Sequence, residues 1–499
     1  MKKIYKNKFI VLILILQIVL CSVFISCGEN KANETKTPDN NADVNNADGN
    51  SGELNVPEAV DELYPYPEHD FKNEIINILS RRDGWADGSQ DLEDLFVESM
   101  TGEVFNDAVY DRTKKVEEKY NVEIKMIYIA DPTATITKSI KADNDEYQLI
   151  QEKLMFMSSS LATQNYLINL ENIGSINLDA PWYNRNAIKD MSINNKVTAL
   201  GGDMTINDKS GVIMAVFNKK MLEDYALENL YTTVRDGKWT LDKLYELIMQ
   251  TTVDLNGDGK YTFKDDQWGL VCEDYGGWML AIASGNRLAA LDGNGMPYMT
   301  AVTEKSVSDY DKIMKIMYEK QGRAETGDDE AHVRIFLENR CFISIDMMSN
   351  IAMLRGMDED FGIIPLPKQD VNQKDYITTI SPWQSRFIAM PSTCGNPEMV
   401  GAVVDAMSRE SVNTIAPAYY NNLLNQKIAR DEESIEMIQQ IFDSIIYDIG
   451  SVFNWGGIWD LQHSFFSTKQ QDYAGYYEKY VGKVEAALEK TIETMQQFD

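Results

Sequence analysis

The chain has 499 residues, a length that at about 150 residues per domain predicts two or three domains. Hydrophobic residues make up 44% and charged residues 25%, which excludes a chain disordered throughout, and a single long apolar run excludes a protein with several membrane spans. Because 47 basic residues face 78 acidic ones, the net charge of −31 argues against a nucleic-acid partner.

The N-terminus predicts export from the cell. Lysines within the first eight residues precede an apolar stretch, Phe9–Leu20, and Cys27 follows shortly after it. This order resembles the bacterial lipoprotein signal. We therefore expect residues 1–26 to be a signal peptide and Cys27 to carry the lipid that anchors the protein to the extracellular face of the bacterial cell membrane. An uncleaved anchor or a plain secretion signal would also leave the bulk of the chain outside the cell.

Residues 27–57 are rich in Asn, Asp, Glu, Thr and Gly and contain almost no large apolar side chains. Such a segment cannot bury enough surface to fold, so we predict a flexible tether there. The folded domain is then expected to cover residues 58–499.

Strand and helix patterns alternate along this folded part. Short apolar or alternating runs predict strands over Glu74–Leu79, Asn121–Tyr128, Glu146–Gln151, Lys196–Leu200, Gly211–Phe217, Trp268–Cys272, Cys341–Ile345 and Phe361–Ile364. Helical spacing predicts helices over Val104–Tyr120, from Ser158, after Thr240, from Asn396 onward and from Tyr473 to about Gln497. The alternation indicates α/β architecture, and the length indicates two α/β lobes.

Few cysteines remain after the expected signal peptide and the lipidated residue. Cys272, Cys341 and Cys394 are widely spaced and odd in number. They predict buried free thiols and not a disulfide framework.

Several short stretches carry a resemblance to a known family. They are Ala180–Ala187 (APWYNRNA), Gly201–Asp203, Val216–Lys220 (VFNKK), Asp236–Thr240 (DGKWT), Asp254–Gly259 (DLNGDG) and Phe361–Lys368 (FGIIPLPK). Their order and spacing behind a lipoprotein signal resemble the extracellular solute-binding proteins of bacterial ABC importers, of the carbohydrate-binding family 1 type. The resemblance runs from about Phe71 to Phe498.

The resemblance implies a two-lobed, periplasmic-binding-protein-like fold of type II, with a hinge between the lobes and a ligand cleft. It implies a first lobe over about 70–205 with returning segments at about 375–410. The second lobe would cover about 215–370 with part of the C-terminal helices. Hinge segments are expected near Gly201–Asn218 and Pro367–Ile377.

A calcium-like loop follows the helix after Thr240. The pattern D-x-N-x-D-G-x5-D wraps oxygen ligands around one point, as a hard cation requires. Its expected ligands to a structural Ca2+ are Asp254, Asn256, Asp258, the carbonyl of Lys260, Thr262 and Asp265. A solvated turn of Asp, Asn and Gly is the alternative.

Candidate ligand-binding residues combine aromatic faces, which stack on sugars, with side chains that hydrogen-bond hydroxyl groups. They lie at the carboxyl ends of predicted strands, on the segment that crosses back between the lobes, at a helix start and in an aromatic–glycine cluster. The candidates are Tyr275, Trp278, Asp346, Asp203, Trp383, Arg386, Ser158, Ser159 and Trp455. For Trp455 a helix-packing corner is an equal alternative.

The resulting hypothesis is a non-enzymatic lipoprotein that captures a carbohydrate, most simply an oligosaccharide, by hinge closure and delivers it to a membrane permease. We expect a monomer with no organic cofactor. A binding protein for peptide or cationic cargo is the main alternative, followed by a secreted glycosidase, which needs two carboxylates about 5 to 10 Å apart. A surface sensor or adhesin without a permease is a further alternative.

Overall fold

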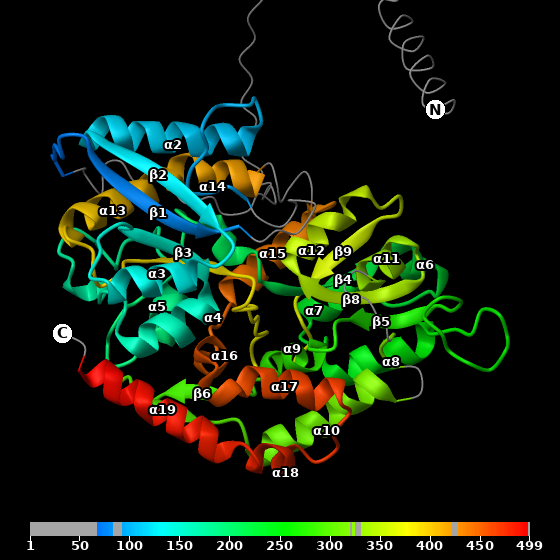
Figure 1. Cartoon of the computed structure of the whole chain (residues 1–499). Helices are drawn as coiled ribbons and strands as arrows, with labels where there is room; N and C mark the ends of the chain where they lie inside the picture. The colour runs from blue at the N-terminus through cyan, green and yellow to red at the C-terminus, as the bar shows by residue number, and fades with distance from the viewer. Residues whose placement is uncertain (1–66, 83–91, 320–321, 325–330, 422–427, 498–499) are drawn as a thin grey trace, which may run out of the picture. The chain divides into compact units, whose positions relative to one another are not determined.

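Two four-stranded sheets organise the folded part of the chain, for which a computed structural model describes residues 67–82, 92–319, 322–324, 331–421 and 428–497 (Figure 1). The predicted signal peptide, the lipidated Cys27 and the predicted tether all lie outside the described residues. The first sheet contains β1 (Glu74–Arg81), β2 (Val122–Ile129), β3 (Leu149–Lys153) and β10 (Arg386–Ala389), in the order β10-β3-β1-β2. Strands β1, β2 and β3 are parallel to one another, and β10 is antiparallel to β3.

Strand β1 lies inside the first sheet and has buried residues on both faces. Ile76 and Ile78 pack into one apolar core, whereas Leu79 packs into the other. A continuous apolar run is what a parallel strand covered on both sides requires. The helices of this lobe are α2 (Val104–Tyr120), α3 (Pro132–Lys141), α4 (Leu154–Phe156), α5 (Arg185–Met191), α13 (Pro397–Asn413) and α14 (Ile415–Pro417).

The second sheet mixes parallel and antiparallel strands. It contains β4 (Ile213–Asn218), β5 (Trp268–Cys272), β8 (Cys341–Met347) and β9 (Phe361–Ile364), in the order β5-β8-β4-β9. Only the β5–β8 pair is parallel. The helices packed on it are α6 (Lys219–Asp224), α7 (Leu230–Arg235), α8 (Leu241–Thr251), α11 (Ala331–Leu337), α12 (Met348–Ile351) and α15 (Glu432–Asp443).

A further group of helices contacts elements of both lobes. It consists of α9 (Gly276–Ala283), α10 (Glu304–Tyr318), α16 (Ile449–Phe453), α17 (Ile458–Ser467), α18 (Tyr473–Glu478) and α19 (Val481–Gln496), with the hairpin β6 (Ala289–Leu291) and β7 (Pro297–Met299). Helix α16 packs against α4 of the first lobe, and α10 packs against α8 of the second lobe. The described part is therefore the two α/β lobes that the sequence predicts, with this helical group beneath them.

The chain crosses between the lobes on segments that pair with one another. The backbone N–H of Ile213 donates to Thr379 at 3.1 Å, and that of Ser381 donates to Gly211 at 2.7 Å. A third segment joins them, because Thr378 forms a parallel bridge with Ile445. The returning crossing is thus made by residues 378–385, later in the chain than the expected 367–377.

Three predicted elements differ from the structure. Lys196–Leu200 forms only isolated bridges, because Leu200 meets Ile388 and no strand lies along the rest of the segment. The helix predicted from Ser158 begins at Leu154 and ends at Gln164 after a π-helical turn, Met157–Leu161. The helix predicted from Tyr473 is two helices, because the helical conformation is interrupted between Glu478 and Val481.

Other local predictions are confirmed. The strands Trp268–Cys272 and Phe361–Ile364 and the helix Val104–Tyr120 have the predicted bounds. The Thr240 hydroxyl caps α8 by accepting the N–H of Lys243. The three described cysteines are buried free thiols.

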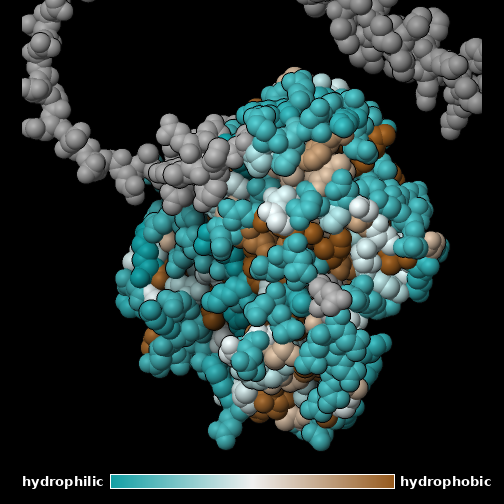
Figure 2. All heavy atoms as spheres, turned by 90° about the vertical axis from the view of Figure 1, so that its left-hand side faces the viewer, coloured by the Kyte–Doolittle hydropathy of each residue, from teal (hydrophilic) through white to brown (hydrophobic). Residues whose placement is uncertain are grey.

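Hydrophilic side chains cover most of the face drawn in Figure 2, with smaller apolar areas between them. The large exposed apolar residues of the described surface include Leu255, Tyr298, Val371 and Trp383, of which Trp383 is 44% exposed. None of the described helices combines the length and the apolar character that crossing a membrane requires.

Candidate functional site

Four segments that are far apart in sequence meet where the chain crosses between the lobes. The end of β3 runs beside the returning crossing, because the N–H of Leu154 donates to Ser385 and that of Met155 donates to Pro382, both at 2.9 Å. The N–H of Met348, after β8, donates to Val212 at 2.8 Å. We call this meeting of residues 153–156, 210–213, 346–349 and 381–386 the lobe junction.

An aromatic and cationic cluster covers the first-lobe side of the lobe junction. The Trp383 ring meets the Phe156 ring edge to face at 4.9 Å between centroids. The Lys153 ammonium lies 4.7 Å from the centre of the Trp383 ring, within the range of a cation–π contact. Trp383 is therefore held in place by neighbours while a large part of its surface remains in solvent, as a platform for an apolar ligand face requires.

A buried ion pair holds the strand ends behind this cluster. The Arg81 guanidinium donates to both carboxylate oxygens of Glu152, at 2.5 and 2.8 Å, and it lies over the Phe156 ring. Thr133 donates to the same carboxylate at 2.7 Å. Arg386 is almost fully buried and donates to the carbonyl of Arg81 at 2.8 Å, so its place is structural in this conformation.

The second-lobe side of the lobe junction carries a histidine between two carboxylates. His332 Nε2 lies 2.6 Å from Asp346, at the end of β8, and Nδ1 lies 2.9 Å from Glu273, directly after β5. The ring N–H directions are poorly aligned with both carboxylates, so the contacts are ion pairs more than ideal hydrogen bonds. Asp346 also accepts from the side chain of Asn350 at 2.8 Å.

Charge decides the protonation of this histidine. Burial alone would lower the pKa of His332, but the contacts with Asp346 and Glu273 outweigh it and raise the pKa to about 10. The imidazolium therefore ties the ends of β5 and β8 together at neutral pH.

Tyr275 and Trp278 follow β5 on the same side but differ in exposure. Tyr275 is partly exposed and meets the His463 ring edge to face at 5.7 Å. Trp278 is 1% exposed, donates to Ser451 at 3.2 Å and packs on Trp459, so in this conformation it belongs to the core.

The two glycines between these aromatic residues serve packing within the protein. A Cβ added to Gly277 would lie 2.3 Å from the Phe466 ring, and one added to Gly276 would lie 2.4 Å from Cys272 Sγ. Glycine at both positions therefore permits the close approach of α9 to α17 and to β5.

Two other candidates, Trp455 and Asp203, lie in buried surroundings outside the lobe junction. Trp455 is 2% exposed, stacks on Phe453 and donates to Thr491 at 2.9 Å, which makes it the helix-packing corner that was the alternative. Burial raises the pKa of Asp203 to about 7, beside a buried pair in which Lys209 donates to Asp208 at 2.9 Å.

The candidate serines do not open a helix. Ser158 and Ser159 lie inside the π-helical turn, so no free helix N-terminus is present to hold a ligand. Ser158 is buried beside α5 and Phe453, whereas Ser159 is partly exposed. The Ser159 hydroxyl makes a weak contact with the Ser160 hydroxyl at 3.5 Å.

Most of the residues that sequence reasoning missed lie at or just beyond the carboxyl ends of strands. Lys153 and Phe156 were missed because the predicted strand ended at Gln151, two residues before β3 does. The rule that sites form at the carboxyl ends of strands applies to them and to Glu273. No sequence signal distinguished His332.

The calcium-like loop is folded through its own backbone. Asp254 accepts the N–H groups of Gly257 and Gly259 at 2.7 Å, and Asp258 accepts that of Lys260 at 2.8 Å. Asn256 accepts from Asp258, and the hydroxyl of Thr262 donates to Asp265 at 3.1 Å.

Buried Asp266 closes the base of this loop by accepting from Leu255 and Thr262. Within the described residues, no three His, Cys, Asp or Glu side chains converge as a metal site. The donor set is all oxygen and largely exposed, which fits Ca2+ by chemistry.

The fold is similar to that of several solved structures, among them an ABC substrate-binding protein and a cyclo/maltodextrin-binding protein. The ABC substrate-binding protein Lmo0181 from Listeria monocytogenes, in complex with cycloalternan, is 13% identical over 85% of this chain and 98% of its own, with a TM-score of 0.51. Apo RafE from Streptococcus pneumoniae is 12% identical over 85% and 98%, with a TM-score of 0.53. A cyclo/maltodextrin-binding protein in complex with maltotetraose is 12% identical over 84% and 96%, with a TM-score of 0.54.

Sequence comparisons add nothing to this structural likeness. No protein-family model matches the sequence, and no curated protein matches it. At identities of 12 to 13% the likeness establishes the two-lobed, periplasmic-binding-protein-like fold of the chain.

Proposed function

We propose that the protein is the substrate-binding component of an ABC importer and that it captures an oligosaccharide between its two lobes. The observation that carries the proposal is Trp383, a held but 44% exposed aromatic platform with a lysine at its face, at the place where the lobes meet. Relatives in fold are described in complex with cycloalternan and with maltotetraose, which supports a glycan as the cargo class.

Capture needs no covalent chemistry. Sugar C–H faces stack on Trp383, and hydroxyl groups pair with the charged and polar ends of the strands around it. Closure of the lobes is favoured only to the extent that the sugar binds the closed arrangement more tightly than the open one. The closed form then docks on a membrane permease and releases the cargo.

Three further features belong to the same proposal. Cys27 would carry the lipid that holds the protein at the extracellular face of the membrane, and the protein would act as a monomer. The loop of Asp254, Asn256, Asp258, Lys260, Thr262 and Asp265 would hold a structural Ca2+, which stiffens one lobe and takes no part in capture.

A thermal-shift screen of the purified protein against a glycan panel tests the proposal. A ligand present at about 100 times its Kd stabilises a folded protein by about 2.7 kcal/mol, which is a measurable rise in Tm. A rise with one glycan family and no hydrolysis of that glycan is the expected result. Rises with peptides or polyamines only, or release of sugar products, would contradict it.

A further inference from the structure

A groove of about 910 Å³ lies between elements of both lobes and shares no lining residue with the lobe junction. Its walls are α5 of the first lobe and the end of α7 in the second. Residues 374–377 and the chain from the end of α15 to Ile446 complete it.

Basic side chains are concentrated in this groove although the protein is strongly acidic. The basic lining residues are Lys189, Arg235, Arg287, Lys368 and Lys374. The two arginines are already engaged, since Arg235 pairs with Glu436 and Arg287 lies 3.6 Å from Asp190. Besides these acids, Asp375 and Asp443 also line the groove, both exposed to solvent.

Lys368 is the unusual member of this set. It is only 4% exposed, and its ammonium makes no hydrogen bond or ion pair with any residue that the structure describes. Its one close partner is the buried ring of Tyr376, whose centre lies 5.2 Å away. A buried cation without an anionic partner is costly, and a cation–π contact offsets only part of that cost.

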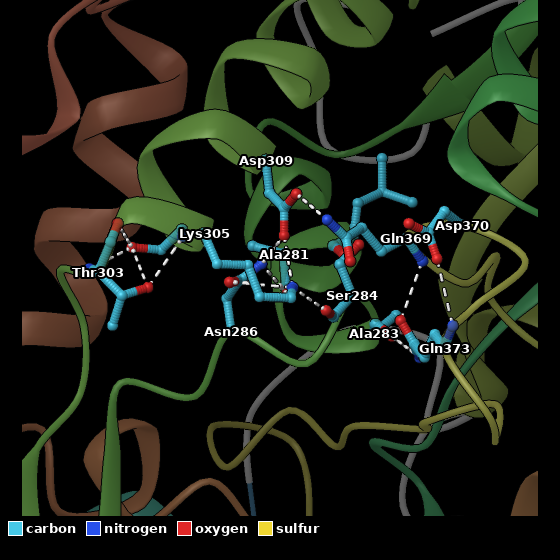
Figure 3. Close-up of polar contacts among 12 residues, drawn as sticks. Ala281, Ala283, Ser284, Asn286, Thr303, Lys305, Asp309, Gln369, Asp370 and Gln373 are labelled. Carbon is cyan, nitrogen blue, oxygen red and sulfur yellow. Dashed lines mark hydrogen bonds and ion pairs between the residues drawn. The ribbon is translucent and has the colours of Figure 1, made fainter.

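The fold holds Lys368 firmly in this position. Its N–H donates to Trp239 at 3.1 Å, and its carbonyl accepts from Leu241 at 2.8 Å. The next residue, Gln369, donates to buried Asp309 at 2.7 Å, within a network that includes Lys305 and Asn286 (Figure 3). The charge is therefore preorganised, as the binding of a small ion requires.

We propose that the groove is a second ligand site, which binds a small oxyanion of the carboxylate or phosphate class with Lys368 at its base. Lys189 and Lys374, which are exposed at the groove, complete the cationic set. An oxyanion gives Lys368 the charge-assisted partner that the described protein groups do not supply. The site is separate from sugar capture and does not depend on it.

The test uses the full-length protein with inorganic phosphate and, in a separate arm, succinate as probes. Isothermal titration at constant ionic strength, with chloride as the reference anion, should detect binding of at least one probe. Lys368→Met should weaken that binding roughly tenfold or more, because a hydrogen bond to a charged group is lost. Lys479→Met is the matched control, since Lys479 also lies over a tyrosine ring, 5.7 Å from that of Tyr476, and is exposed.

The phosphate and succinate arms show which class of anion binds. A second pair of variants keeps the test valid if Lys368→Met does not fold. If Lys368→Met does not fold, Lys189→Met and Lys374→Met should each weaken binding several-fold. Absence of binding for both probes would overturn the proposal. The proposal would also be overturned if Lys368→Met bound the probe with the same affinity as the wild type and Lys479→Met. The same affinity in both Lys189→Met and Lys374→Met would overturn it too.

Discussion

At the scale of single residues, Trp383 combines two properties that seldom coincide. Most tryptophans of this fold are packed away, as Trp182, Trp239 and Trp278 are, whereas Trp383 keeps 44% of its surface exposed. Its edge-to-face contact with Phe156 and the Lys153 ammonium hold the ring without covering it. Exposure of a large fixed aromatic surface costs hydration free energy, which a sugar face on the ring would recover.

Trp383→Ala should weaken glycan binding and leave the fold intact. Loss of a central aromatic contact costs about 2 kcal/mol, which is roughly thirtyfold in Kd. Tyr298→Ala is the control, because Tyr298 is 50% exposed on β7, outside the lobe junction. Titration calorimetry of both variants and the wild type gives the answer, and equal affinities for all three would remove Trp383 from the site.

The His332 contacts predict a pH-dependent contribution to stability. The folded-state pKa of about 10 lies above the unfolded value of about 6.5. The imidazolium therefore contributes fully below about pH 6.5, and its contribution is lost as pH rises towards 10.

The free energy of unfolding of wild type and His332→Gln, measured in urea at pH 6, 8 and 10, tests this contribution. The wild type should exceed the variant most at pH 6, and the difference should shrink steadily towards pH 10. A difference that does not change with pH would show that the ring contributes packing and not charge.

At the scale of secondary-structure elements, short apolar runs in the sequence predict the bounds of buried strands correctly. β5 and β9 have the predicted bounds because each is a short apolar run that both faces of a sheet can bury. The pattern of Lys196–Leu200 is equally apolar, yet a strand needs a partner along its length, and pairing partners are not visible in local sequence.

The candidate site was partly predictable for the same reason. Trp383 and Asp346 were found from the crossing segment and a strand end, and both lie at the lobe junction. Trp278 shared that local context, but its exposure depends on Ser451, which is 173 residues away in sequence, and on Trp459. Long-range packing of this kind decides burial and leaves no mark beside the residue itself.

Two helical glycines, Gly277 in α9 and Gly482 in α19, predict opposite effects of the same substitution. Gly277→Ala should cost about 1 to 3 kcal/mol, because its Cβ would press into the buried Phe466 ring. Gly482→Ala in α19 meets nothing within 4 Å and should stabilise by about 0.4 to 1 kcal/mol. Chemical unfolding of the two variants measures both, and a neutral Gly277→Ala would refute the tight α9–α17 contact.

The calcium-like loop gives a prediction for metal addition. Millimolar Ca2+ should raise the Tm of the wild type relative to a chelator control, because a bound ion would neutralise three closely spaced acids. Asp258→Ala should abolish the rise, whereas Asp236→Ala, at an exposed acid beside α7, should keep it. An equal Tm with and without Ca2+ would leave the loop as a turn held by its own N–H groups.

At the scale of the whole molecule, the lobes are joined by a few chain segments that pair with one another. The crossings before β4 and before β10 pair with each other, and Met155 of α4 lies 3.8 Å from the Asn454 side chain near α16. Rotation of one lobe against the other therefore changes the surroundings of Trp383, which sits on a crossing. This arrangement lets the binding of one ligand act on the separation of the lobes.

Hydrogen–deuterium exchange with and without the glycan found in the screen tests the central claim most directly. Capture between the lobes predicts slower exchange on both sides of the lobe junction, at residues 153–156 and 381–386 and at residues 273–275 and 346–349. Protection of one lobe only, or of a surface outside the junction, would contradict capture between the lobes.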